Sequence, residues 1–238
     1  MSSATITTSA RLMNFTPQTE EQAMVRKVAV SSFLGNFIEW FDYASYSYFA
    51  TTIALVFFPT DNHTVAMLQT FGVFALSFIL RPIGALFWGS YGDKKGRKAA
   101  LAHSIMFMSG ASFLIGCLPS YSVIGVGAPI LLLLLRMVQG FSASGEYAGA
   151  ATFLGEYAPT SKRGIYCSLI PASTAIGLLA GSTLATLMTA NMNSSAMVGW
   201  GWRVPFLLAG PLGLIVLYIR AKLADSPVYQ SMNDALES

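Results

Sequence analysis

The chain has 238 residues, of which 54% are hydrophobic and only 11% are charged. An ordinary soluble domain carries about 25% charged residues, so this composition argues against a soluble globular protein, a disordered chain and a nucleic-acid-binding protein. The sequence also lacks a glycine-rich phosphate loop, a metal-ligand cluster and a nucleophile–base set. We therefore expect a protein that is not an enzyme and that needs no metal or cofactor.

Six long apolar runs indicate an all-α membrane protein. A helix of about 20 apolar residues crosses a bilayer, and each run reaches that length. The runs occupy Val28–Phe58, Val65–Tyr91, Ala99–Leu118, Pro129–Tyr157, Gly164–Ala190 and Trp202–Leu223. Residues 1–27 would then be a polar cytoplasmic tail without the apolar core of a signal peptide. Residues 28–223 would form a six-helix transmembrane domain, and residues 224–238 a cytoplasmic C-terminal segment.

Basic residues gather at every second turn of this expected bundle. The N-terminal tail, the turns near residues 94 and 162, and the exit from the last span hold 11 of the 14 lysines and arginines. The alternate turns hold only Arg203, and Arg81 and Arg136 fall within spans. Cytoplasmic loops of membrane proteins carry an excess of basic residues. We therefore expect a multi-pass protein of the inner (plasma) membrane with both termini in the cytoplasm.

Polar and charged side chains inside the spans are the first candidate functional residues. A charge at mid-bilayer costs roughly 3 kcal/mol or more and by default marks a functional site. In the first span, Asn36, Glu39 and Asp42 follow one another at intervals of three, so we expect them near one helical face. Tyr46 lies one turn further along. The fourth span carries Arg136, Gln139 and Glu146 on another such face.

Arg136 needs an acidic partner on another helix. Glu146 is ten residues away, about 15 Å along the helix axis, so these two residues cannot pair within their own span. Glu39 and Asp42 lie at a similar expected depth, which makes either acid a suitable partner. We expect a polar cavity between spans one and four, in which an unpaired carboxylate can hold a proton near neutral pH. The alternative is a structural ion pair that fixes the packing of the two helices.

The second turn carries the most specific motif of the chain. It reads Gly89-Ser-Tyr-Gly-Asp93-Lys94-Lys95-Gly96-Arg97-Lys98. We expect Gly89 to end span two with close helix contact, and Gly96 to permit a tight turn. Asp93 can pair with Arg97. The motif resembles, position for position, the signature between the second and third helices of major facilitator superfamily transporters. The resemblance implies a gating role for Gly89, Asp93, Lys94, Gly96, Arg97 and Lys98.

Other segments extend the resemblance over about residues 30–230. Arg136-Met-Val-Gln139-Gly140 is similar to a motif of the family's fourth helix. Glu156 and Arg163 resemble the acid and base that bracket the next cytoplasmic turn, and so join the expected gating residues. Gly35-Asn-Phe-Ile-Glu39-Trp-Phe-Asp42 resembles the metabolite:H⁺ symporter branch, which includes proline/betaine, α-ketoglutarate, shikimate and citrate carriers. The proline/betaine type is the most similar.

The resemblance implies a fold and a mechanism. The fold is two inverted three-helix repeats that form one half of a transporter, with a second six-helix half as partner. The mechanism is alternating-access symport of H⁺ with a small polar metabolite, such as an osmolyte or a carboxylate. Glu39 and Asp42 would carry protons, and Arg136 would be a counter-ion or a clamp for a substrate carboxylate. The expected pathway comprises Asn36, Glu39, Asp42, Tyr46, Arg136, Gln139 and Glu146.

Two alternatives stay open. The chain ends where the family's first half ends, so it could be a truncated membrane domain that does not transport. It could also be a half that must pair with another half. The sequence does not identify the substrate, and coupling to H⁺ rather than Na⁺ rests on the resemblance alone.

Overall fold

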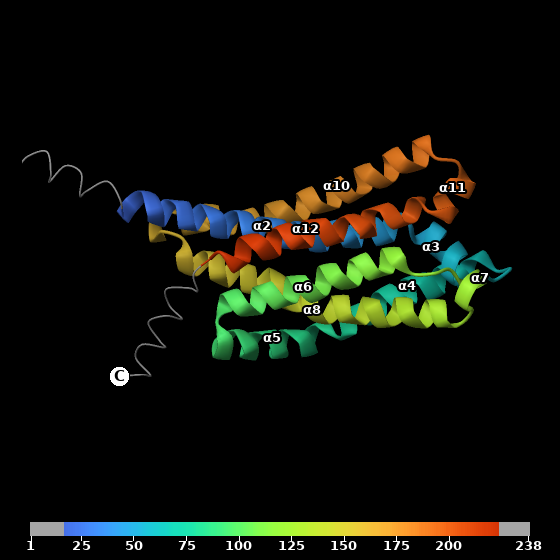
Figure 1. Ribbon diagram of the computed structural model, residues 1–238, viewed down its shortest axis with the longest axis horizontal. Helices are drawn as coiled ribbons and strands as arrows, with labels where there is room; N and C mark the ends of the chain where they lie inside the picture. Colours follow the sequence, from blue (N-terminus) through green and yellow to red (C-terminus); the bar gives the residue numbers. More distant parts are fainter. Residues whose placement is uncertain (1–16, 224–238) are drawn as a thin grey trace, which may run out of the picture.

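The computed structural model describes residues 17–223, which form a bundle of long helices (Figure 1). The expected C-terminal segment and most of the expected tail lie outside the described residues. The main helices are α2 (Pro17–Tyr48), α3 (Ala50–Phe57), α4 (His63–Ile79), α5 (Arg81–Lys95), α6 (Arg97–Cys117), α8 (Gly127–Tyr157), α10 (Leu169–Asn191) and α12 (Val204–Ala221). Short connecting elements are α7 (Tyr121–Ile124), η1 (Thr160–Lys162), α9 (Arg163–Cys167), α11 (Ser194–Gly199) and η2 (Gly201–Arg203).

The expected spans match the helices within a few residues, except at the N-terminus. Helix α2 begins at Pro17, eleven residues before the expected start at Val28, because the polar stretch before Val28 continues the helix. Among the described residues, five helical segments are long and apolar enough to cross a membrane: 63–95, 97–117, 127–157, 160–191 and 201–221. Helix α2 falls outside this set. Its acidic and basic residues lower its hydropathy, although it runs alongside the other five.

The second expected span is broken in its middle. Helix α4 ends at Ile79 and α5 begins at Arg81, with Pro82 in the first turn of α5. Proline lacks a backbone N–H and its ring collides with the carbonyl four residues earlier, so it interrupts a continuing helix but suits a helix start. The break at Leu80 therefore places Arg81 halfway along the second span.

The six long segments are related as two sets of three. Helix α10 packs along α2, and α4 and α5 pack along α8 in the same manner, while α6 and α12 pack against each other. In Figure 1, α10 with α2 and α5 with α8 form the two edges of the bundle, and α6 and α12 lie between them. This arrangement agrees with the pair of three-helix repeats that the resemblance implies.

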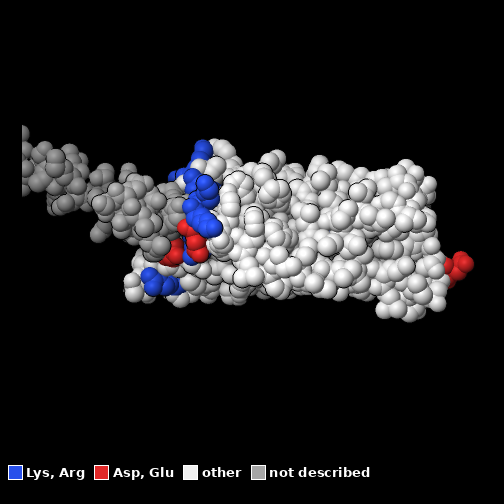
Figure 2. Space-filling view, turned by 90° about the horizontal axis from the view of Figure 1, so that it is seen from below, with Lys and Arg blue, Asp and Glu red and all other residues white. Residues whose placement is uncertain are grey.

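Charge is distributed as in a membrane-spanning bundle. Figure 2 shows lysines and arginines gathered near one end of the molecule, with a long middle zone free of charged residues on this face. Many large apolar side chains are exposed on the outside, among them Leu68, Leu86, Leu179 and Leu214. Both ends of the described chain lie at the same end of the bundle as the turn between α5 and α6 (Figure 1). An even number of crossings produces this arrangement.

Candidate functional site

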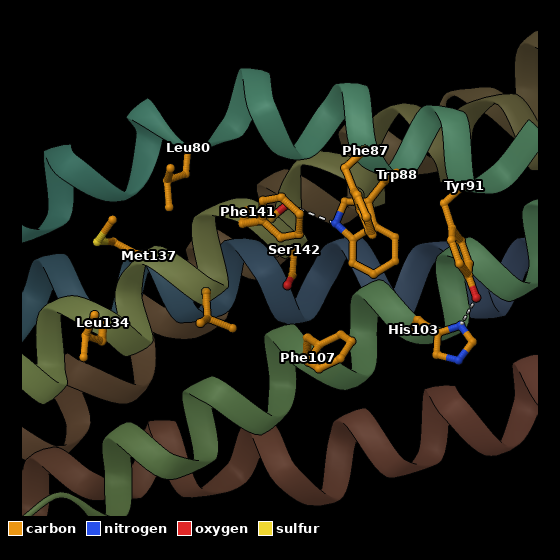
Figure 3. A pocket seen from close by; sticks show the side chains of 11 residues that line it. Leu80, Phe87, Trp88, Tyr91, His103, Phe107, Leu134, Met137, Phe141 and Ser142 are labelled. Carbon is orange, nitrogen blue, oxygen red and sulfur yellow. Dashed lines mark hydrogen bonds between the residues drawn. The ribbon is translucent and has the colours of Figure 1, made fainter.

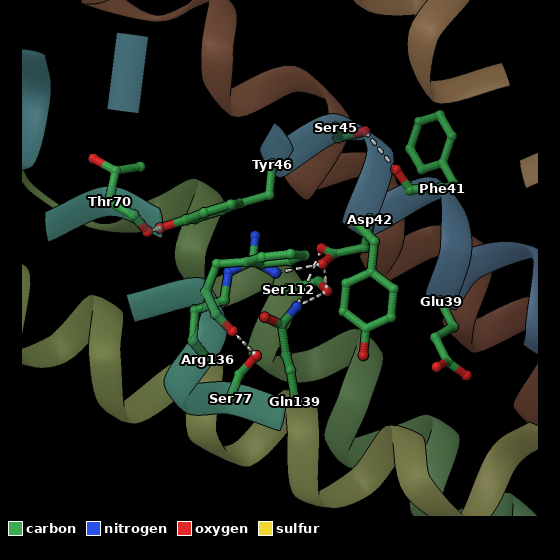
Figure 4. A network of polar contacts seen from close by, with 12 residues as sticks. Glu39, Phe41, Asp42, Ser45, Tyr46, Thr70, Ser77, Ser112, Arg136 and Gln139 are labelled. Carbon is green, nitrogen blue, oxygen red and sulfur yellow. Dashed lines mark hydrogen bonds and ion pairs between the residues drawn. The ribbon is translucent and has the colours of Figure 1, made fainter. Parts of the chain in front are cut away.

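Asp42 and Arg136 form the centre of a fully buried polar network between α2 and α8. The Arg136 Nη1 atom donates to Asp42 Oδ2 at 2.7 Å, and the two side chains are 0% and 5% exposed. Gln139 donates to Asp42 Oδ1 at 3.1 Å, and the Ser112 hydroxyl donates to the same oxygen at 2.8 Å. Figure 4 shows these groups converging on the Asp42 carboxylate. The predicted contact between Arg136 and an acid of the first span is confirmed for Asp42.

The Arg136 guanidinium is also held by aromatic rings. Its carbon atom lies 3.8 Å from the ring centre of Tyr46 and 5.5 Å from that of Phe206. The Tyr46 hydroxyl donates to the Thr70 carbonyl oxygen at 2.9 Å, which fixes the ring beneath the cation. A cation over an aromatic face gains more when it is shielded from water. Tyr46 therefore contacts Arg136 through its ring, while its hydroxyl binds the backbone of α4.

Glu39 lies apart from this network and has a different partner. Its Oε1 atom accepts a hydrogen bond from Arg81 Nη2 at 2.5 Å. The same nitrogen donates to the Tyr43 hydroxyl. Figure 4 shows the Glu39 side chain to one side of the Asp42 cluster. Of the two acids that were candidate partners for Arg136, only Asp42 pairs with it.

Glu146 is part of a third ion pair inside the bundle, and both members of this pair are buried. The two terminal nitrogens of Arg220 donate to the Glu146 carboxylate: Nη1 to Oε2 at 2.9 Å, and Nη2 to Oε1. The two side chains are each 1% exposed. Arg220 Nη1 also donates to the Leu101 carbonyl oxygen at 2.5 Å. The sequence places Arg220 at the exit of the last span, and the structure agrees with that position. The residue lies in the last helical turn, but its long side chain reaches back into the bundle.

Asn36 does not share a face with the two acids that follow it. Its amide nitrogen donates to Ile170 O at 3.0 Å, to Ser173 at 2.8 Å and to Thr174 at 2.9 Å, all on α10. Each step of three residues turns the side chain back by about 60°, so the six residues from Asn36 to Asp42 span about 120°. The prediction that Asn36, Glu39 and Asp42 face one cavity is wrong, because they face α10, α5 and α8 respectively.

The turn between α5 and α6 has most of its expected geometry. Asp93 Oδ1 and Arg97 Nη2 form an exposed ion pair at 3.1 Å, as predicted. Gly96 joins the helices with φ of +96°, a conformation that residues with a side chain rarely adopt. Lys94 and Lys98 flank this pair on the same turn.

One expected feature of the gating residues is wrong. Gly89 does not end the helix, since α5 continues to Lys95, and a side chain at Gly89 would meet no atom within 4 Å. The close glycine contact lies elsewhere: Gly84 packs against the backbone of Phe141. Glu156 lies in the last turn of α8 and Arg163 begins α9, so the two residues lie on either side of the turn as expected.

An apolar pocket between α5, α6 and α8 is unsuited to a polar metabolite. It is lined mainly by Leu80, Phe87, Trp88, Phe107, Leu134, Met137, Val138 and Phe141, with Tyr91 and His103 at one end. Figure 3 shows the aromatic rings that line it. None of the acids or arginines of the three ion pairs contributes to its wall. The buried ion pairs are therefore the better candidates for a functional site.

Comparison with known sequences decides the family. The sequence family described as "Sugar (and other) transporter" matches residues 27–238, which is nearly all of the chain. The chain belongs to this family of the major facilitator superfamily. A proline/betaine transporter of Salmonella typhimurium is 42% identical over 217 residues, and the glycine betaine/proline/ectoine/pipecolic acid transporter OusA of Dickeya dadantii has the same identity. Each alignment covers 91% of this chain and 43% of the relative.

Solved structures of the superfamily share the fold. The xylose transporter XylE from Escherichia coli, in a partially occluded inward-open conformation, superimposes with a TM-score of 0.79 at 17% identity. The match covers 88% of this chain and 52% of XylE. The chain thus spans about half the length of the transporters that it resembles, and it has the fold of their N-terminal half. Because its family consists of transporters, the expectation that the protein is not an enzyme is confirmed.

Within this superfamily fold, sequence reasoning missed two arginines and a tyrosine. The sequence places Arg81 inside a span without identifying its partner, and it places Arg220 at the exit of the last span without indicating a buried contact. Tyr43 was not singled out. A signal was present for Arg81, since a charge within a span demands a partner of opposite sign. No comparable signal existed for Arg220, because basic residues at the end of a last span are ordinary.

Proposed function

We propose that the protein is a secondary active transporter in which this chain forms the N-terminal half. It couples the movement of a small polar solute to protons by alternating access. The observation that carries this proposal is the set of three acids, Glu39, Asp42 and Glu146, buried at 2%, 4% and 0% exposure among membrane-spanning helices. Apolar residues of similar volume often stabilise a protein as well as a buried ion pair does. Packing alone therefore does not account for three ion pairs inside the bundle, which points to a functional role.

The buried acids suit proton transfer. Asp42 and Glu39 each have one arginine partner, so each loses its charge balance when it gains a proton. Protonation of Asp42 would leave the Arg136 cation without its counter-ion inside the bundle, and this imbalance favours a rearrangement of α2 against α8. Arg136 then acts as the counter-ion of Asp42, because its side chain is 0% exposed and cannot reach a solute from this position.

An osmolyte is the solute class best supported. Two relatives with 42% identity over 91% of this chain are named for proline and betaine transport, and one of these names adds ectoine and pipecolic acid. All four are small molecules that carry a carboxylate and a positively charged nitrogen. We infer the same class for this protein, with a second six-helix half completing the binding cavity.

The location follows from the family and from the distribution of basic residues along the chain. We propose the inner membrane, with both termini in the cytoplasm and the turn from Asp93 to Arg97 on the cytoplasmic face. Gly89, Asp93, Lys94, Gly96, Arg97, Lys98, Glu156 and Arg163 would act in gating, because they lie at the end of the bundle where the two halves of a transporter separate.

Uptake by purified protein in liposomes tests the proposal. The liposomes should accumulate radiolabelled glycine betaine or proline against its gradient when the pH outside is lowered. An ionophore that collapses the pH gradient should abolish accumulation, while xylose should not be accumulated. If the 238-residue chain accumulates nothing alone but does so when co-reconstituted with a second six-helix half, the paired-half alternative is correct. Failure in both forms would favour a membrane domain that does not transport.

A further inference from the structure

Arg81 differs from the other two arginines that bind an acid inside the bundle. Its side chain is 26% exposed, whereas those of Arg136 and Arg220 are 0% and 1% exposed. The helix break at Leu80 holds it halfway along the second span. Its guanidinium carbon lies 5.0 Å from the ring centre of Tyr43 and 4.7 Å from that of Phe78, which orients the group. Of the three arginines, Arg81 is therefore the most accessible to a solute.

The hydrogen-bonding capacity of this pair is only partly used. Arg81 Nη2 donates to both Glu39 and Tyr43, but its Nε atom is buried and has no partner among residues 17–223. The second carboxylate oxygen of Glu39 is also buried without a partner in this part of the chain. An arginine presents five N–H groups in a planar fork that matches a carboxylate with two parallel bonds. The contact with Glu39 uses one of these nitrogens, so a better-placed carboxylate can replace it.

We propose that Arg81 binds the carboxylate of the transported solute, and that Glu39 competes with the solute for this guanidinium. The inference rests on the proposed transport function. When the solute binds, the ion pair between Arg81 and Glu39 breaks and one between Arg81 and the solute forms. Glu39 then takes a proton from water, because a buried carboxylate without its partner is strongly disfavoured. One proton enters with each carboxylate, and solutes without a free carboxylate are not bound.

The surroundings of Glu39 favour this exchange. Asp42 and Tyr43 lie nearby on α2, Glu146 and Arg136 face the region from α8, and Arg220 faces it from α12. Helix α10, which packs along α2, carries no charged or histidine residue. Arg136 and Arg220 are each bound to another acid, so neither is available to balance Glu39. The charge of Glu39 thus depends on Arg81 alone.

If the solute displaces Glu39 from Arg81, Glu39 should become protonated only when a solute with a carboxylate is bound. Infrared difference spectra in lipid nanodiscs, recorded on the form of the protein that accumulates betaine, should show a protonated-carboxyl band when glycine betaine is added near neutral pH. Glu39→Gln should remove the band, which assigns it to this residue. Choline, which has the same cationic group but no carboxylate, should produce no band. Arg81→Gln should abolish the response to glycine betaine, whereas Arg26→Gln, an exposed arginine of the same bundle, should leave it intact.

A band that glycine betaine and choline change equally, or that neither changes, overturns the proposal. Transport kinetics give a second reading in the form of the protein that accumulates betaine. Its KM should fall about tenfold per unit decrease in pH where Glu39 titrates, since one proton is bound per solute. In Glu39→Gln the KM should not depend on pH. Transport with an unchanged pH dependence in this variant contradicts the competition and leaves the transport function standing; absence of transport in the unmodified protein contradicts that function instead.

Discussion

Glu146 and Arg220 form an ion pair that joins α8 to α12 directly beneath Gly35 of α2. A side chain at Gly35 would overlap both the Glu146 carboxylate and the Arg220 guanidinium. Arg220 Nη2 also donates to the Ser31 carbonyl oxygen at 3.3 Å, and Ser104 donates to Glu146 at 3.4 Å. The pair therefore ties together helices from both three-helix repeats.

Removing one member of this pair should destabilise the fold. We expect Glu146→Gln to lower the free energy of unfolding by about 3 kcal/mol or more, because it leaves the Arg220 cation buried without a counter-charge. The double variant Glu146→Gln with Arg220→Met should recover most of this loss. Lys222→Met, an exposed change at the end of the same helix, serves as the control. Unfolding followed by tryptophan fluorescence in nanodiscs measures the effect, and equal stability of Glu146→Gln and Lys222→Met would contradict it.

A methyl group at Gly35, on α2, should disturb the ion pair between Glu146 and Arg220 by steric overlap. Gly35→Ala forces the Glu146 and Arg220 side chains to shift, and we expect it to cost about 1–3 kcal/mol through overpacking. Gly72→Ala is the matched control, because a side chain there meets no atom within 4 Å. Alanine also favours a helix over glycine by up to about 1 kcal/mol, so Gly72→Ala should be neutral or stabilising. Comparable losses in both variants would show that Gly35 is not a packing position.

The sequence predicts the helices well and their partners poorly. Hydropathy alone locates the spans because the lipid phase demands continuous apolar helices. A contact between Arg136 and an acid of the first span was also predictable, since the depths and the signs of charge agree, but these do not distinguish Asp42 from Glu39. The partners of Glu39 and Glu146 were not predicted. The direction in which Glu39 points from its helix decides its pairing with Arg81, and the length of the Arg220 side chain decides the pairing with Glu146. Neither pairing can be obtained from spacing without knowing which helices are neighbours.

The orientation of the chain is testable by labelling. Cys117 and Cys167 are replaced by serine, and single cysteines are introduced at Ser194 or Lys95, both of which are exposed. A membrane-impermeant maleimide added to intact cells should label position 194 and leave position 95 unlabelled until the membrane is opened. The expectation comes from the excess of basic residues near Lys95. Labelling of position 95 in intact cells would reverse the proposed topology.

Asp93 should affect turnover rather than solute binding. The residue is exposed at the end of the bundle and pairs only with Arg97 among the residues described, far from the buried ion pairs. Surface pairs contribute little to stability, so Asp93→Asn should fold normally. We expect kcat for uptake to fall by about tenfold with KM changed less than twofold, as for a step that follows binding. Raised KM with unchanged kcat would place the residue in the binding site instead.

We propose that buried acids of this half couple transport to protons. The most direct test measures glycine betaine uptake into liposomes with and without an imposed pH gradient, for Glu39→Gln and Asp42→Asn beside the unmodified protein. Both variants keep the shape of the side chain and lose the carboxylate that takes up and releases a proton. Both variants should exchange betaine down its gradient but fail to accumulate it when the pH gradient is applied. Uphill accumulation by both variants at the unmodified rate would contradict this proposal.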